Sequence, residues 1–192
     1  MSRADPGDYR IFIGAFPTGE LADRIQAVRR AYDEKTAVIT PPHVTLAGTY
    51  WRHGPAEPAS EAELIARLQA TADTLPAFEL ILGGIRTFGG RVVYLGVAET
   101  PELLATRQTL LTAAGPDKHG RSFTPHLTLA MRLKPAQVQA MLQELRAGAW
   151  ENGRFAAPIT QLHLMQRGPQ DPAWRAIAVV PLISRSSSAA GK

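Results

Sequence analysis

Two short segments of the chain carry the same chemically active pattern. Residues 40–47 read TPPHVTLA and residues 123–130 read FTPHLTLA. Each octet has a proline, then a histidine, then a threonine two positions later. The histidine and threonine positions are His43, Thr45, His126 and Thr128. The recurrence of one octet about half a chain apart indicates an internal repeat.

The spacing within each octet predicts what these side chains can do. Residues two apart in a β-strand face the same side, so each histidine shares a face with its threonine, and the apolar residues between them face a core. We expect a pseudo-twofold relation that sets the two pairs across a cleft. Two imidazoles can supply a base and an acid on opposite sides of a phosphorus atom, because the ordinary histidine pKa of ~6.5 permits either charge state. The hydroxyls can donate to the nonbridging oxygens.

Other chemistries fit the sequence less well. A two-histidine metal site needs a third ligand, yet neither octet contains an acidic residue and no HExxH spacing is present. The chain has no cysteine, which excludes disulfides, thiolate metal sites and a cysteine nucleophile, and it has no GxSxG element. We therefore expect no metal and no cofactor. A metal-dependent phosphohydrolase and a non-catalytic module that binds nucleotide or RNA remain open as alternatives.

Length and composition set the remaining limits. The 192 residues are 45% hydrophobic and 20% charged, which is typical of one globular domain. The formal charge of +4 mildly favours anionic partners, although 17 arginines against 4 lysines also fit the codon bias of a GC-rich genome. No apolar run approaches the ~20 residues that span a membrane, and no signal peptide is recognisable. We expect a cytoplasmic monomer without a membrane partner, with flexible residues 1–8, one domain over 9–183, and a disordered tail over 184–192.

Strands and helices alternate around the two octets. Strands are predicted at 9–16, 36–40, 44–51, 78–85, 91–97, 123–133, 159–166 and 175–182. Helices are predicted at 19–32, from Ser60 to Pro76, from Thr100 to Gly115, and from Pro135 to Gly148. Ser60 begins a capping-box sequence, Thr100 precedes a first-turn proline, and Gly89-Gly90 marks a hairpin turn. The fold class is therefore α+β with largely antiparallel sheets.

The paired HVTL and HLTL segments resemble the two HxT/S motifs of the two-histidine phosphoesterase superfamily. Within it, the chain looks most similar to the bacterial and archaeal RNA 2′,3′-cyclic phosphodiesterases, also known as 2′-5′ RNA ligases. RIFIGAFP resembles the opening strand of that family, and FELILGGIRTFGGRVVYLGV its central hairpin. The resemblance implies a bilobal fold with a central groove between pseudo-twofold-related lobes. It also implies cofactor-free hydrolysis of RNA-terminal or nucleoside 2′,3′-cyclic phosphates to 2′-phosphates, with 2′-5′ ligation in some members.

The resemblance also suggests site residues. It assigns catalysis to His43, Thr45, His126 and Thr128. Close relatives often have an arginine five residues after the second motif histidine, where this chain has Met131 followed by Arg132. Strand parity places Arg132 with the second motif, so it is a candidate phosphate contact.

Aromatic side chains could stack on a base. The candidates are Tyr50, Phe88, Phe123 and Trp174, of which Phe123 and Trp174 are preferred. His163 lies in an apolar strand and could approach the groove. Because the product of the family is a 2′-phosphate, the 3′-oxygen leaves. We assign its protonation to His43 and the activation of water to His126, and the reverse assignment stays open.

Overall fold

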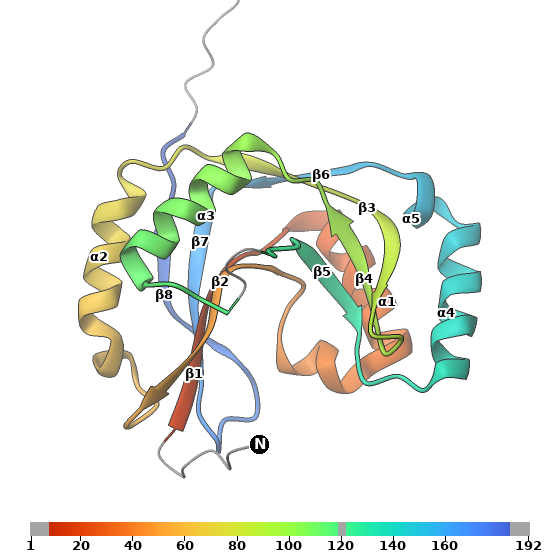
Figure 1. The fold of residues 1–192 in the computed structure, drawn as a ribbon, viewed down its shortest axis with the longest axis horizontal. Helices are drawn as coiled ribbons and strands as arrows, with labels where there is room; N and C mark the ends of the chain where they lie inside the picture. Colours follow the sequence, from red (N-terminus) through yellow and green to blue (C-terminus); the bar gives the residue numbers. More distant parts are fainter. Residues whose placement is uncertain (1–7, 119–121, 185–192) are drawn as a thin grey trace, which may run out of the picture.

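One curled antiparallel sheet forms the centre of the molecule (Figure 1). The computed structural model describes residues 8–118 and 122–184. The strands are β1 (Asp8–Ala15), β2 (Val44–His53), β3 (Phe78–Phe88), β4 (Val92–Val97), β5 (His126–Ala130), β6 (Phe155–Ile159), β7 (Gln161–Arg167) and β8 (Arg175–Pro181). Their order in the sheet is β6-β3-β4-β5-β2-β1-β7-β8. The α+β class and the two-lobed antiparallel arrangement expected from the sequence are confirmed.

The sheet consists of two equivalent lobes that meet at the motif strands. The first lobe is the run β2-β1-β7-β8 and the second is the run β5-β4-β3-β6. β2 and β5 pair in antiparallel fashion with Val44 opposite Leu127. These residues directly follow the two motif histidines, so the pseudo-twofold relation passes through this pair. The repeat seen in the sequence is therefore a repeat of strand order as well.

The helices cover the side of the sheet opposite the motif side chains. They are α1 (Gly19–Ile39), the 3-10 turn η1 (Pro58–Glu61), α2 (Ala62–Ala72), α3 (Pro101–Ala114), α4 (Pro135–Ala147) and the short α5 (Ala149–Asn152). α3 packs on β2 while α1 packs on β5, so each motif strand has a helix behind it. Figure 1 shows α2 and α3 beside one lobe and α1 and α4 beside the other.

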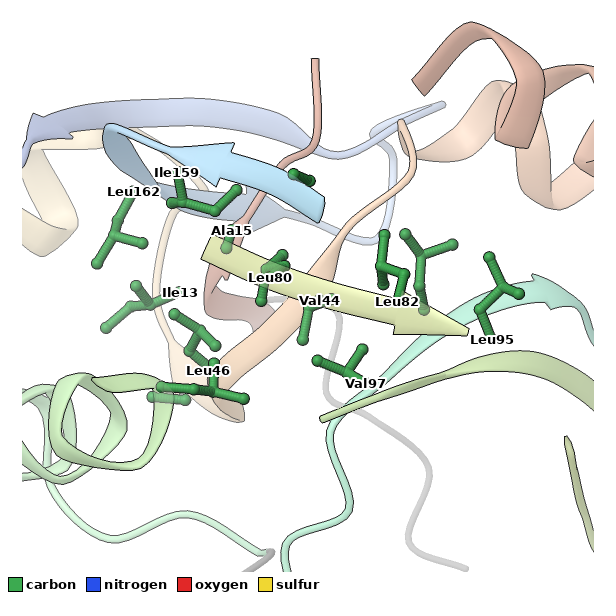
Figure 2. Packing of buried hydrophobic residues seen from close by; sticks show 14 of the residues in the cluster. Ile13, Ala15, Val44, Leu46, Leu80, Leu82, Leu95, Val97, Ile159 and Leu162 are labelled. Carbon is green, nitrogen blue, oxygen red and sulfur yellow. The ribbon is translucent and has the colours of Figure 1, made fainter. Parts of the chain in front are cut away.

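The alternation of side chains along the motif strands builds the core. Val44 and Leu46 on β2, and Leu127 and Leu129 on β5, are at most 1% exposed. They join apolar residues of both lobes in one cluster, part of which is shown in Figure 2. Truncating such a buried leucine to alanine typically costs about 2–5 kcal/mol, so these positions fix the strands that carry the histidines.

The predicted strand over residues 36–40 is wrong, because α1 continues through Ile39. The β-branched residues there favour a strand, but tertiary contacts override that preference. The helix kinks at Asp33, whose carboxylate accepts a hydrogen bond from the Thr36 amide and restarts the helix. The buried Arg29 side chain then donates to the carbonyls of Thr36 and Thr40 and holds the last turn.

Two other strand predictions need correction. β5 covers only His126–Ala130, which is shorter than the predicted 123–133. β6 at Phe155–Ile159 was not predicted, and the strand expected at 159–166 is β7 at Gln161–Arg167. β6 is an edge strand that contains Pro158, which is where a sheet tolerates proline. Its short FAAPI sequence lacks the usual strand signal.

The predicted ends of the domain partly lie outside the described residues. Residues 1–7 and 185–192 are in that category, so the expected flexible N-terminus and tail stay predictions. Asp8, placed with the flexible N-terminus, instead begins β1 and pairs with His53. Across the described ranges, no helix combines the length and the apolar character needed to cross a membrane.

Of the two predicted helix caps, one is present. Thr100 accepts a hydrogen bond from the Leu103 amide at the start of α3, as the sequence predicts. Ser60 instead lies within η1 and donates to the Pro55 carbonyl, so the predicted capping box does not form. α2 begins at Ala62 and ends at Ala72, short of Pro76.

This difference gives a matched pair of variants. We expect Thr100→Ala to lower the free energy of unfolding by about 1 kcal/mol, because it removes an N-cap. Ser60→Ala should cost less, since it removes one exposed hydrogen bond. Urea denaturation of both variants measures the difference, and an equal loss in the two would contradict the assignment of Thr100 as the cap.

Candidate active site

The four motif side chains lie on one face of the sheet, here called the motif face. Val44 and Leu127 point to the core, so their neighbours on both sides point the other way. Continued by one residue in each direction, the Val44–Leu127 register sets His43 against Thr128. The same register sets Thr45 against His126. Each imidazole therefore has the hydroxyl of the other motif as its cross-strand neighbour.

Both imidazoles are oriented by the same backbone contact. His43 Nδ1 lies 2.9 Å from the Pro41 carbonyl oxygen, and His126 Nδ1 lies 2.8 Å from the Thr124 carbonyl oxygen. A carbonyl can only accept, so each Nδ1 must carry the proton. In the neutral ring this leaves the Nε2 atom as the acceptor. Both histidines thus present the nitrogen that can take up or deliver a proton.

Aromatic rings pack against each histidine. The His43 ring stacks on Phe12 and Phe16, at centroid distances of 4.8 and 5.3 Å. The His126 ring meets the edges of Phe88 and Tyr94 at 4.9 and 5.3 Å. These contacts restrict the rings to one orientation each.

The environment of His43 favours its neutral form. Burial, together with the smaller effects of the Arg29 and His126 charges, lowers the pKa of His43 to about 4. The hydrogen bond to Pro41 opposes this shift. The influence of His126 shows that the two imidazoles lie within electrostatic range of each other. In the free protein, His43 is therefore neutral at neutral pH.

A buried ion pair replaces strand pairing beyond the point where β2 and β5 meet. Arg107 of α3 pairs with Asp117 at 2.8 Å, and both side chains are nearly inaccessible to solvent. Arg107 donates to the Leu46 carbonyl of β2, and Asp117 accepts from the Gly48 amide 3.1 Å away. The Leu46 carbonyl and the Gly48 amide, on the unpaired edge of β2, therefore both have hydrogen-bond partners.

The second lobe has a similar hydrogen bond between an aspartate and a backbone amide. The Met131 amide donates to Asp33 of α1 at 2.9 Å, and Met131 stands five residues after His126 just as Gly48 stands five after His43. The sequence repeat gave no sign of the two aspartates, because they come from outside the octets.

Among the described residues, no three histidine, aspartate or glutamate side chains lie close enough together to bind a metal ion. The ring nitrogens His43 Nδ1 and His126 Nδ1 are bound to carbonyls, which leaves one nitrogen per ring. The two remaining nitrogens, His43 Nε2 and His126 Nε2, are thus suited to proton transfer.

Comparison with known proteins shows the family to which the chain belongs. The family model of the 2′-5′ RNA ligase superfamily matches residues 17–171, which is most of the chain. The chain belongs to the 2′-5′ RNA ligase superfamily.

Relatives of this superfamily member match most of its length. A Bacillus cytotoxicus protein named "Putative phosphoesterase" is 29% identical over 159 residues, or 81% of this chain and 87% of the relative. The fold resembles that of E. coli LigT complexed with NADP+, with a TM-score of 0.59 and 21% identity over 91% of this chain and 95% of that one. TT0787 of Thermus thermophilus gives a TM-score of 0.58 with 18% identity, over 92% of this chain and 100% of that one.

The substrate-binding candidates of this 2′-5′ RNA ligase superfamily member fall in different places. Trp174 lies on the motif face, where its ring meets Phe12 edge-on at 4.7 Å. Phe123 has the Arg107 guanidinium 3.9 Å from its ring centre, so that ring face is occupied by the buried ion pair. Phe88 touches His126. Of the two preferred aromatic candidates, only Trp174 is thus connected to the ring cluster around a motif histidine.

The prediction that Tyr50 stacks on a substrate base is wrong. Tyr50 is 8% exposed, belongs to the core, and donates its hydroxyl to the Gly115 carbonyl. Two register shifts along β2, between Thr45 and Ala47 and between Gly48 and Tyr50, together return Tyr50 to the core side with Val44. Trp51 stands opposite Arg10 on the motif face and is 45% exposed. Trp51 was overlooked, and alternation alone does not identify it, because the two shifts interrupt the period of two.

Arg132 does not reach the motif face by strand parity, because β5 ends at Ala130. It is exposed, with a left-handed φ of 58°, so the turn decides its direction. Its charge still acts on Arg10 of β1. His163 lies opposite Gly14 of β1 and its ring is 4.7 Å from Phe16, so it belongs to the motif face. Of the other histidines, His53 is exposed and His119 lies outside the described residues.

A second arginine beside the site was not foreseen. Gly96 of β4 pairs with His126, and a Cβ added there would stand 3.4 Å from Arg86 Nε. Arg86 therefore lies over Gly96, next to the second motif. It lines a cavity of about 270 Å³ together with Arg154.

The buried ion pair yields a second prediction. We expect Asp117→Ala to lower the free energy of unfolding by about 3 kcal/mol or more, because it leaves the Arg107 charge buried without its partner. The exposed pair Arg67–Glu63 provides the control, and Glu63→Ala should cost less than about 1 kcal/mol. Chemical denaturation measures both values. Similar costs in the two variants would show that Asp117 is dispensable for holding β2.

Proposed function

We propose that this chain hydrolyses 2′,3′-cyclic phosphates of RNA ends or nucleotides to 2′-phosphates, without a metal ion. Membership of the 2′-5′ RNA ligase superfamily supports phosphoester chemistry, and the Bacillus relative bears a phosphoesterase name. E. coli LigT, which shares the fold, has been solved with 3′-AMP and with phosphate. Nucleotides are thus the class of ligand that the proposal expects.

The observation that carries the proposal is the cross-strand arrangement of two His-x-Thr units. Each unit presents one Nε2 atom on the motif face, and the two units come from different lobes. In-line displacement at phosphorus needs the base and the acid on opposite sides. Two histidines on one strand could not provide that geometry, whereas histidines related by a pseudo-twofold axis can.

The reaction requires two proton transfers and one exchange of bonds. One imidazole Nε2 takes a proton from water as the water oxygen bonds to phosphorus. The bond from phosphorus to the 3′-oxygen breaks, and the other imidazole delivers its Nε2 proton to that oxygen. The products are a 2′-phosphate and a free 3′-hydroxyl. A 5′-hydroxyl of RNA in place of water would give a 2′-5′ linkage by the same steps, which is the ligase activity included in the proposal.

The threonines serve the phosphoryl group in this proposal. Extending the Val44–Leu127 register by one residue in each direction puts each hydroxyl opposite the histidine of the other motif. A hydroxyl there can donate to a nonbridging oxygen, whose charge grows in the transition state. Thr45 and Thr128 then stabilise the transition state without taking part in the proton transfers.

The division of roles depends on the charge of His43. We keep the assignment in which His43 protonates the 3′-oxygen and His126 activates water. A pKa of about 4 means that His43 lacks the required proton in the free protein. The anionic phosphate must therefore raise that pKa on binding, because a negative charge a few ångströms away stabilises the imidazolium. If the bound phosphate does not raise the pKa of His43, then His43 is the base that activates water and His126 is the acid that protonates the 3′-oxygen.

The central experiment is hydrolysis in the presence of EDTA. We expect 2′,3′-cyclic AMP and RNA ending in a cyclic phosphate to yield 2′-phosphates, with a bell-shaped pH profile. His43→Ala and His126→Ala should each lower turnover by at least ~10²-fold, and Thr45→Ala or Thr128→Ala by less. The control is His53→Ala, at the far end of β2 with its side chain 86% exposed. Chromatography against 2′- and 3′-phosphate standards identifies the product.

The alternatives give different results in the same assay. Binding of nucleotide without turnover in the wild-type protein would identify a non-catalytic module. Activity that EDTA abolishes and a divalent cation restores would identify a metal-dependent phosphohydrolase. Full activity in either histidine variant would refute the proposed mechanism.

The charge of His43 can be followed directly. By NMR of the imidazole signals, we expect a pKa near 4 in the free protein and a higher one when 2′-AMP saturates the site. The sign follows from the added negative charge, which favours the protonated ring. The corresponding titration of His126→Ala assigns the signals. A pKa that stays near 4 in the complex would make His43 the base and His126 the acid.

A cytoplasmic location and a monomeric state also remain predictions. Size-exclusion chromatography with light scattering tests the second of these, and a mass of twice 20.8 kDa would contradict it.

A further inference from the structure

An arginine on the motif face lies between two tryptophans. The Arg10 guanidinium of β1 is 5.3 Å from the ring centre of Trp51 and 5.3 Å from that of Trp174. Trp51 comes from β2, and Trp174 immediately precedes β8. Trp51 is 45% exposed, so part of its ring surface stays accessible to a ligand although Arg10 lies over it. Two flat aromatic surfaces and a cation are thus held together by three separate parts of the first lobe.

Among residues 8–118 and 122–184, no carboxylate compensates the positive charge at this place. Arg167 of β7 stands directly opposite Arg10, and like charges in such positions destabilise a sheet. No carboxylate among the described residues forms an ion pair with Arg10, Arg132 or Arg167. The nearby acids are engaged elsewhere, since Asp8 contacts His53 and Asp171 contacts the Gly168 amide and Arg175.

Burial adds to this unfavourable situation. It lowers the pKa of Arg10, and the charges of Arg167 and Arg132 lower it further. Arg132 follows β5 in the second lobe, so positive charge from both lobes acts on Arg10. An anion placed among these guanidinium groups would relieve the repulsion.

A continuous row of rings connects this place to the first motif. Phe12 stacks on His43 at 4.8 Å and meets Trp174 at 4.7 Å. Phe12 and Arg10 are two residues apart on β1 and therefore share the motif face. The Arg10 guanidinium is thus two ring contacts away from the imidazole that acts on the terminal phosphate.

We propose that Arg10, Arg167, Trp51 and Trp174 form a subsite for the nucleotide that precedes the terminal one, so that the substrate is single-stranded RNA rather than a mononucleotide. This inference rests on the proposed function and specifies its substrate. The arginines bind the phosphate that joins the last two nucleotides, and the exposed Trp51 ring stacks on the base of the preceding one.

The chemistry of the four residues favours RNA over other anions. A phosphate alone would need the arginines but no exposed indole. A base alone would need the indole but no guanidinium groups without a carboxylate partner; within the described part of the chain, Arg167 donates only to the Asp171 carbonyl, which leaves its charge available to an anion. Proteins that bind single strands combine the two features, with aromatic stacking tolerant of sequence. A mononucleotide occupying the terminal site has no group that reaches the subsite.

Binding to reaction products tests the subsite without depending on turnover. The probes are the trinucleotide ApApA bearing a terminal 2′-phosphate and the mononucleotide 2′-AMP, both titrated in EDTA with tryptophan fluorescence as the signal. We expect the trinucleotide to bind at least about tenfold more tightly, since one stacked base alone supplies such a factor. We also expect it to quench the fluorescence more strongly.

Variants then assign the difference to these residues. Arg10→Gln and Trp51→Ala should each reduce the preference for the trinucleotide at least about fivefold, and Trp51→Tyr should restore much of it, because tyrosine also stacks. Arg10→Gln should also reduce the salt dependence of trinucleotide binding, by about 0.7 in the logarithmic slope for one lost phosphate contact. Arg24→Gln is the matched control, because Arg24 lies over Trp150 and Phe155 instead. Trp51 is exposed, so its variants keep the test valid if Arg10→Gln fails to fold.

The outcomes separate this inference from the proposed function. Equal affinity for the two probes, or an unchanged preference in both Trp51→Ala and Arg10→Gln, would overturn the subsite even if cyclic phosphates are hydrolysed. Failure of the wild-type protein to hydrolyse any cyclic phosphate would overturn the proposed function. A trinucleotide preference that depends on Trp51 would still support the subsite in that case.

Discussion

The meeting of β2 and β5 governs the rest of the structure. These strands pair at Val44 and Leu127, and farther along β2 the Leu46 carbonyl and the Gly48 amide bond to Arg107 and Asp117. A buried backbone group without a partner costs about 1–3 kcal/mol, so the strands can diverge only because side chains take over the bonding. Asp33 does the same for the amide of Met131, the residue that follows β5. The lobes therefore touch where the histidines are, and separate beyond.

This constraint explains why the site is symmetrical in its backbone but not in its chemistry. Both imidazoles are fixed by the carbonyl two residues earlier, a contact that the repeated octet itself supplies. The surroundings of the two rings differ, since His43 stacks on Phe12 and Phe16 and senses the charge of the buried Arg29, whereas His126 makes T-shaped contacts with Phe88 and Tyr94. Gly14 makes this packing possible, because a Cβ there would stand only 2.9 Å from the Phe12 ring. Equivalent residues can thus take unequal roles as acid and base.

The distribution of arginines gives the positive charge of the chain a structural meaning. Arg29 and Arg107 are buried and bind carbonyl oxygens next to the motifs. Arg86 and Arg10 lie on either side of the histidines, over Gly96 and between two tryptophans respectively. A codon bias can supply many arginines, but it does not place them around one site. The charge of Arg107 is neutralised by Asp117, whereas Arg10 and Arg86 place positive charge beside the motif strands, as the proposed anionic substrate requires.

The sequence alone determined the repeat, the face shared by each histidine and threonine, and the alternation of strands and helices, because these depend on periodicities of two and 3.6 residues. The placement of Tyr50 in the core and Trp51 outside depended on the fold, since two register shifts interrupt the alternation along β2. Residues 36–40 and β6 needed the tertiary structure, since contacts from Arg29 and Asp33 override a β-branched sequence and an edge strand needs little signal of its own. The direction of Arg132, the occupation of Phe123 by Arg107, and the pairing of β2 with β5 were likewise decided only by the fold. Each depends on contacts between residues far apart in the chain, and no local pattern records which distant side chain will satisfy a given backbone group.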